Sequence, residues 1–112
     1  MEVKPRFRIL YTEEAMDFLQ TLSAKAQDKI AYNINKCRFY TDNELFKKLD
    51  DSEIWEFRTL YNKTAYRLFA FWDKQEDTLV VATHGIMKKT QKTPLKEIEK
   101  AEQIRKEYFK NK

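Results

Sequence analysis

Two arginines, three lysines and one histidine are the side chains of this sequence best suited to act on a phosphate. The guanidinium group of arginine is a planar fork that grips two phosphoryl oxygens at once, and it stays charged at any working pH. Lysine neutralises phosphate charge, and histidine transfers protons near neutral pH. The six residues are Arg58, Arg67, His84, Lys88, Lys89 and Lys92, and His84 is the sole histidine of the chain.

The positive charge of the chain is concentrated toward its C-terminal end. Residues 1–85 contain 13 Lys or Arg and 14 Asp or Glu, whereas residues 86–112 contain 9 and 4, so the two parts carry −1 and +5. Such a distribution is expected when one segment meets a polyanion or an acidic partner. The alternative is that these lysines only solvate the face of a terminal helix.

Length and composition indicate one folded domain, residues 1–112. A chain of 112 residues can bury enough surface for one core, and 42% hydrophobic residues argue against disorder. The longest apolar run, residues 68–72, is too short to cross a membrane, and the N-terminus lacks the apolar stretch of a signal peptide, so we expect a cytoplasmic protein. Cys37 is the only cysteine, which excludes an internal disulfide and a thiolate-rich zinc site. We expect neither a metal nor a cofactor.

The first half of the sequence predicts a strand followed by two helices. Residues 6–11 are rich in strand formers, and Thr12 can cap a helix over residues 13–22. Ser23 can cap a second helix, in which apolar residues recur at helical spacing at Ala26, Ile30, Ile34 and Cys37. Turn-forming residues interrupt the pattern over residues 41–51, which we interpret as a connector.

The second half predicts three strands and a final helix. Residues 54–61, 64–73 and 78–84 are rich in aromatic and β-branched residues, and the segments between them are short enough for hairpin turns, so we expect an antiparallel meander. Thr93 can cap a last helix that has Pro94 at its first position. The predicted fold class is α+β: a small antiparallel sheet, in the order β-α-α-β-β-β-α, packed on an N-terminal helical hairpin.

Alternation along the strands decides whether the two arginines share a face of the sheet. Arg58 lies on the side of its strand opposite the aromatic residues, which we expect to face the core. Arg67 lies on the same side of its strand as Phe69 and Phe71. The two arginines therefore share a face only if the face that holds Phe69 and Phe71 is partly open.

Three blocks of the sequence match a known pattern. They are Ile54-Trp55-Glu56-Phe57-Arg58, Tyr66-Arg67-Leu68 and Thr83-His84-Gly85-Ile86-Met87-Lys88-Lys89-Thr90-Gln91-Lys92-Thr93-Pro94. In this order and spacing, the chain resembles the RelE/ParE toxin superfamily, and in particular its HigB-type, phage-derived branch. The resemblance covers roughly residues 5–110, with its specific part in residues 54–101.

The resemblance implies a toxin of a type II toxin-antitoxin module. Many members are endoribonucleases that cut messenger RNA, often in the ribosomal A site, and a small antitoxin silences them. In the HigB-type branch, the antitoxin usually carries a helix-turn-helix DNA-binding domain. Members of the ParE branch act on DNA gyrase instead, so a gyrase-directed toxin is one alternative, and a non-catalytic regulator that keeps only the antitoxin interface is another.

The implied activity assigns roles to the basic residues. Metal-free RNA cleavage needs a base for the ribose 2′-hydroxyl, cations that stabilise the phosphorane and an acid for the leaving 5′-oxygen. The matching blocks imply that Arg58 and Arg67 contact the phosphate. Lys88, Lys89 and Lys92 would line the rim of the same groove, where one of them could transfer the proton if neighbouring cations lower its pKa. The alternative for Arg58 is an ion pair with a carboxylate that stabilises the sheet. The alternatives for the lysines are a solvated basic loop and a surface on which the antitoxin docks.

Further roles stay open at the level of the sequence. His84 is either catalytic or structural, and Tyr108 lies on the apolar stripe of the last helix, which leaves the general base unassigned. Phe69 and Phe71 are candidates for stacking on RNA bases or for a patch under a bound antitoxin. Glu56 could act as a base, although its place beside two arginines favours a role in holding them.

Overall fold

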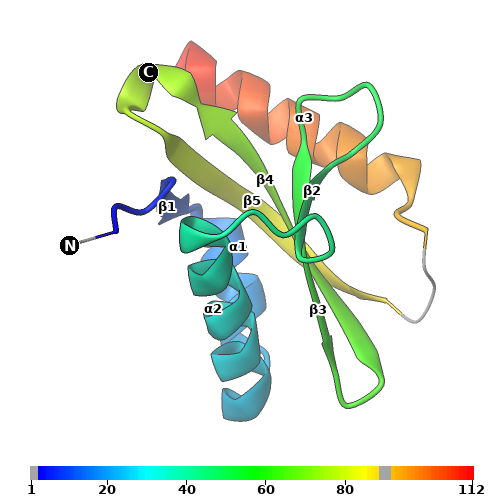
Figure 1. Cartoon of the computed structure of the whole chain (residues 1–112). Helices are drawn as coiled ribbons and strands as arrows, with labels where there is room; N and C mark the ends of the chain where they lie inside the picture. Colours follow the sequence, from blue (N-terminus) through cyan, green and yellow to red (C-terminus); the bar gives the residue numbers. More distant parts are fainter. Residues whose placement is uncertain (1–2, 89–91) are drawn as a thin grey trace.

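The computed structural model describes residues 3–88 and 92–112, and in this part of the chain it shows one mixed sheet with helices on both faces (Figure 1). The strands are β1 (Arg8–Tyr11), β2 (Phe46–Lys48), β3 (Trp55–Tyr61), β4 (Thr64–Asp73) and β5 (Leu79–Lys88). The helices are α1 (Glu13–Gln20), α2 (Ala24–Phe39) and α3 (Leu95–Lys110), and a 3₁₀ turn, η1, spans Lys74–Glu76. The strands lie in the order β1-β5-β4-β3-β2. No helix of the described segments combines the length and the apolar character needed to span a membrane.

The sheet differs from the predicted one in two ways. β1 pairs with β5 in parallel, whereas the other three pairs are antiparallel, so the sheet is mixed. β2 forms inside the segment that was predicted as a connector, because Phe46 turns into the core and stacks on Phe57 with ring centroids 4.1 Å apart. Lys47 and Lys48 stay exposed on this edge strand. The predicted order therefore lacked one strand.

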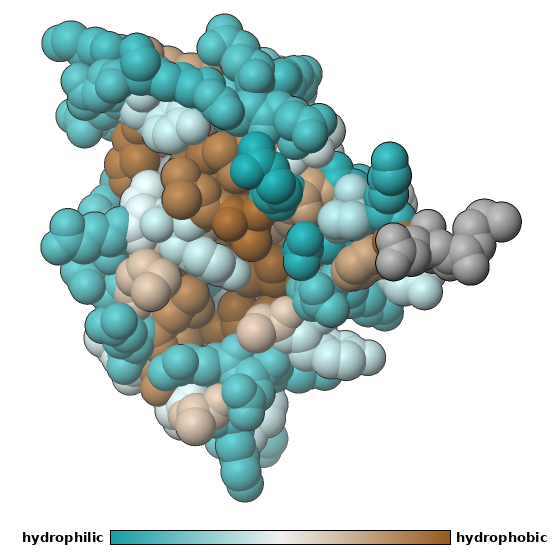
Figure 2. Space-filling view, turned by 90° about the vertical axis from the view of Figure 1, so that its left-hand side faces the viewer, coloured by the Kyte–Doolittle hydropathy of each residue, from teal (hydrophilic) through white to brown (hydrophobic). Residues whose placement is uncertain are grey.

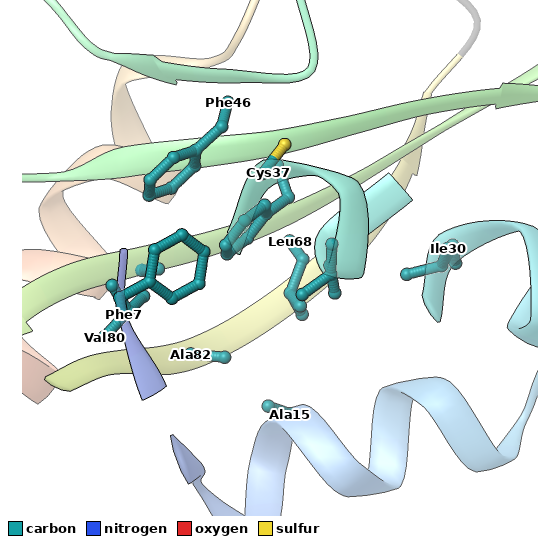
Figure 3. Close-up of a cluster of buried hydrophobic side chains, with 11 residues drawn as sticks. Phe7, Ala15, Ile30, Cys37, Phe46, Leu68, Val80 and Ala82 are labelled. Atoms are coloured by element: carbon teal, nitrogen blue, oxygen red, sulfur yellow. The ribbon is translucent and has the colours of Figure 1, made fainter. Parts of the chain in front are cut away.

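Helices α1 and α2 cover one face of the sheet. α1 contacts β1 and β5, and α2 contacts β3. Ala15 of α1 and Ile30 and Cys37 of α2 belong to the same buried cluster as Leu68 and Val80 of the sheet (Figure 3). The hydroxyl groups of Thr12 and Ser23 accept hydrogen bonds from backbone N–H groups in the first turns of the two helices, so both predicted caps are confirmed.

Gly85 lets α1 lie close to β5. A Cβ atom at this position would come within 2.2 Å of the ring of Phe18 on α1, closer than any side chain tolerates. The only glycine of the chain therefore marks a place where a helix presses against the strand that leads to Lys88.

Helix α3 covers the other face. Ile98 and Ala101 pack over Phe69 and Phe71, whose exposed fractions are both 0%. From the sequence, the two arginines share this face only if it is partly open around Phe69 and Phe71, but the apolar stripe of α3 closes the face at these two residues. Farther along α3, the hydroxyl of Tyr108 donates a hydrogen bond to the buried carboxylate of Asp73 at 2.7 Å, which gives Tyr108 a structural place.

Candidate functional site

A tight turn brings Arg58 and Arg67 opposite each other. Asn62 and Lys63 form the two-residue loop between β3 and β4, and their φ angles of 51° and 65° are those of a type I′ hairpin turn. Counting back along both strands from this turn places Arg58 directly opposite Arg67, with both side chains on the same face. The hairpin thus creates the pair of arginines that the alternation allowed.

A buried carboxylate lies between the two positive charges. Glu56 is 1% exposed, and its Oε1 atom accepts a hydrogen bond from Arg67 and lies 3.4 Å from Nε of Arg58. Its Oε2 atom accepts a hydrogen bond from the hydroxyl of Thr93 at 2.6 Å. Like charges directly opposite each other destabilise a sheet, and the carboxylate offsets this repulsion. One carboxylate against two guanidinium groups leaves the cluster positive.

A β-bulge determines which side chains of β5 share the face of the arginines. Phe69 of β4 pairs with His84, whereas the next residue of β4 pairs with Ala82, so Thr83 is an extra residue in β5. Because side chains alternate along a strand, this insertion turns His84, and with it Lys88, to the face of Arg67.

Lys88 is buried beside the arginine pair. Its side chain is on the face of Arg67, the residue as a whole is 9% exposed, and no described residue accepts a hydrogen bond from its Nζ atom. Burial, reinforced by the positive charge of Arg67, holds the pKa of Lys88 below its ordinary value. A buried amine with a lowered pKa is a group that can give up and take up a proton.

The arginine pair lies between two hollows, which together form what we call the groove. A hollow of about 290 Å³ is lined by Arg58, Arg67 and Lys88 together with Glu44, Lys63 and Tyr66. A second hollow, of about 200 Å³, is lined by the same two arginines together with Lys47, Asp50, Lys92 and Thr93. The structure therefore brings together Arg58, Arg67, Lys88 and Lys92, four of the six basic residues singled out in the sequence. Lys89 lies outside the described residues.

His84 lies apart from the groove although it points to the same face of the sheet. It is 2% exposed, its ring stacks on Phe69, and its Nε2 and Nδ1 atoms each lie 3.1 Å from a partner, Glu97 Oε1 and Thr83 Oγ1 respectively. Burial lowers the pKa of His84, although the hydrogen bond to Glu97 acts in the opposite direction. His84 lines neither hollow, so the structure places it as a packed residue beneath the first turn of α3.

Two predicted RNA contacts are inaccessible, and two residues of the site were not anticipated. Phe69 and Phe71 lie beneath α3 with no exposed surface, so a base has no ring face on which to stack. Thr93 was expected to cap the last helix, but Pro94 is the N-cap residue and the Thr93 hydroxyl bonds to the sheet instead. Lys47 carried no signal, because β2 was not predicted. Among the described residues, no group of three or more His, Cys, Asp or Glu side chains could hold a metal ion.

One comparison with known proteins identifies a phage-derived family, and another identifies a solved structure with a similar fold. Residues 17–106 match the family described as phage derived protein Gp49-like (DUF891). The fold is similar to that of a chain in the crystal structure of the toxin-antitoxin complex RelBE2 from Mycobacterium tuberculosis, with a TM-score of 0.59 and 16% sequence identity, covering 80% of this chain and 98% of that chain. No curated protein matches the sequence significantly.

Proposed function

This chain belongs to the Gp49-like family of phage-derived proteins, and from its site we propose that it is the toxin of a type II toxin-antitoxin module, a HigB-like endoribonuclease that cleaves messenger RNA without a metal. The observation that carries the proposal is the pairing of Arg58 with Arg67 in a groove that also holds the buried amine of Lys88. Two guanidinium forks beside an amine suit the charge and the proton transfers of phosphodiester cleavage. The likeness of the fold to a chain of a toxin-antitoxin complex supports the same function.

The proposed reaction uses the two arginines for charge and Lys88 for proton transfer. The scissile phosphate lies over Arg58 and Arg67, and Lys88, whose pKa is lowered by burial, takes the proton of the ribose 2′-hydroxyl when its amine is unprotonated. The 2′-oxygen then attacks phosphorus, the bond to the 5′-oxygen breaks, and that oxygen takes up a proton from solvent. The products are a 2′,3′-cyclic phosphate and a 5′-hydroxyl. Each preorganised charge that stabilises the phosphorane typically contributes about 3–4 kcal/mol.

The two hollows suit a single-stranded substrate. A phosphate over the arginine pair has room for one nucleoside on either side, and lysines line both spaces: Lys63 and Lys88 in one, Lys47 and Lys92 in the other. Unpaired RNA can present its bases in this way, whereas a duplex cannot. We therefore propose unpaired messenger RNA as the substrate, engaged in the cytoplasm and during translation.

Exposed apolar surface supports an antitoxin partner. On the side of the molecule that carries β1, Figure 2 shows hydrophobic residues gathered in a hollow with hydrophilic rims. Leu10, on the α3 face of the edge strand β1, is 46% exposed, and Met16 of α1, the helix on the other face of the sheet, is 43% exposed. Exposed apolar surface of this kind marks protein contacts. We assign this side to the cognate antitoxin, for which the resemblance implies a helix-turn-helix protein.

The proposed function is tested by brief induction of the chain, with and without the neighbouring antitoxin gene, followed by mapping of RNA 5′ ends. We expect growth arrest together with new 5′-hydroxyl ends in messenger RNA, and rescue by the antitoxin. RNA binding should also weaken with salt, with a log-log slope of about −0.7 per phosphate contact. Arrest without new RNA ends would favour the gyrase-directed alternative, and normal growth with folded protein would contradict a toxin.

A further inference from the structure

Thr93 ties the segment ahead of α3 to the arginine pair. Its hydroxyl donates to Oε2 of Glu56 at 2.6 Å and accepts a hydrogen bond from Nη1 of Arg67 at 3.3 Å. The hydroxyl plays no part in capping α3, since Pro94 is the N-cap residue and makes no side-chain capping bond. Both hydrogen bonds of this side chain are therefore directed at the groove, and their partners lie 37 and 26 residues away in the sequence.

The bond from Thr93 fixes the carboxylate that both arginines share. Oε1 of Glu56 faces Arg67 and Arg58, and Oε2 faces only Thr93 among the contacts of the described residues. Without the hydroxyl, the carboxylate could rotate about its last side-chain bond, a soft torsion with a broad minimum. The planar fork of Arg67 would then follow the carboxylate, and its orientation relative to the groove would change although its charge would not.

We propose that Thr93 is a positioning residue for the cleavage reaction: by holding the carboxylate of Glu56, it keeps the guanidinium plane of Arg67 directed at the scissile phosphate. This inference rests on the proposed ribonuclease function. It assigns to Thr93 an effect on the transition state rather than on RNA binding, because the positive charges that attract RNA remain in place when the hydroxyl is lost.

The first test compares single substitutions in a cleavage assay with a short unpaired RNA. Thr93→Val, which keeps the shape of the side chain but removes the hydroxyl, should lower kcat about ten- to a hundredfold, the range for one lost hydrogen bond to a charged group, with KM within about twofold of the parent. Thr93→Ser should restore most of kcat. The matched control is Thr41→Val, the same change at an exposed residue that lines neither hollow, which should leave both constants unchanged.

A double-mutant cycle separates positioning from a general structural effect. In an Arg67→Lys background there is no planar fork to orient, so Thr93→Val should cost little further activity. Independent losses that multiply in the double variant would overturn the proposal. So would a loss that Thr93→Ser does not rescue, or one that appears in KM alone.

A third measurement needs no RNA and keeps the two proposals distinguishable. In ¹⁵N NMR spectra of the free protein, the Nη resonances of Arg67 should be resolved in the parent and in Thr93→Ser, because rotation of the guanidinium group is restrained. They should average in Thr93→Val. Resolved signals in all three proteins would overturn the positioning role. Restrained signals that depend on Thr93, in a protein that never cleaves RNA, would support the positioning role and contradict the ribonuclease.

Discussion

Arg58 is the direct cross-strand partner of Arg67, and both guanidinium groups contact the one carboxylate of Glu56. The two arginines of the site therefore also belong to the ion-pair network that stabilises the sheet. Removing Arg67 would take away the hydrogen-bonded partner of a buried carboxylate, which is strongly destabilising. A variant that tests chemistry alone must keep the charge and change only its shape.

Arg67→Lys meets this condition. The ammonium group can still pair with Glu56, but it cannot grip two phosphoryl oxygens, so we expect a loss of about a hundredfold in cleavage rate with little change in melting temperature. Single-turnover kinetics and thermal melting provide the two measurements. Arg8→Lys, the same change at an exposed position on β1, is the control and should cleave like the parent. Full activity of Arg67→Lys would contradict the phosphate contact.

Lys88→Met should remove cleavage and yet stabilise the fold at neutral pH. The pKa of Lys88 is lowered, so the folded protein binds this proton less tightly than the unfolded chain does. The parent should therefore gain stability as the pH rises from the lowered pKa toward the ordinary lysine value of about 10.4. Urea unfolding at several pH values should show this gain in the parent and not in the variant. A variant that is less stable than the parent throughout would contradict the prediction.

His84→Gln should affect stability more than catalysis. The pKa of His84 is lowered by burial, so the unfolded chain binds the proton more readily, and the parent should lose stability as the pH falls from about 6.5 through the lowered pKa. The glutamine variant lacks this pH dependence. Its cleavage rate should fall far less than that of Arg67→Lys. An equal loss in the two variants, with both proteins folded, would make His84 a catalytic residue after all.

Gly85→Ala should destabilise the protein through a clash with α1. The added methyl group would overlap the ring of Phe18, and overpacking of this kind costs about 1–3 kcal/mol. Thermal or urea unfolding measures the loss, and a smaller side chain in the double variant Gly85→Ala/Phe18→Leu should recover part of it. An unchanged melting temperature of the single variant would show that the close approach of α1 to β5 does not require glycine at position 85.

Lys112→Met should make the protein more sensitive to acid. Burial alone would raise the pKa of Asp73, but hydrogen bonds from Lys112 and Tyr108 outweigh this effect and lower the pKa. The resulting stability is present above the ordinary aspartate value of about 3.9 and is lost as the pH falls through the lowered pKa. Loss of Lys112 should shift acid unfolding to higher pH. Lys110→Met, an exposed neighbour, should leave the transition where it is, and equal shifts in both would assign the effect to net charge.

A structural feature of this protein could be predicted from the sequence when the residues that determine it lie close together in the chain. The hairpin of β3 and β4 was predictable, because a two-residue turn and strand alternation lie within one short segment. The parallel pairing of β1 with β5 was not, since its partners are far apart in the sequence and no local pattern records the contact. β2 was missed because only Phe46, among three residues, turns into the core.

The composition of the site was harder to predict than the fold. Charge and residue type pointed to Arg58, Arg67, Lys88 and Lys92, which line the two hollows. Phe69 and Phe71 were misjudged, because alternation gives the face of a residue but not whether a helix covers that face. The sequence predicts a cap at Thr93, because a hydroxyl before a proline has the same local pattern whether it caps a helix or reaches across to a sheet.

The extra residue at Thr83 makes the length of β5 as informative as its composition. Side chains in a strand have only two directions, so each residue is effectively even or odd, and one insertion reverses the parity of everything that follows. If β5 paired without this bulge, no residue type in the groove would change, yet Lys88 would turn to the side of α1 and the side chain at the preceding position would lie beside Arg67. A chain that lacks the extra residue would keep Lys88 on the face of Arg67. Relatives of this chain should therefore be aligned by counting residues through the bulge, since a gap misplaced by one position would exchange the lysine for its neighbour.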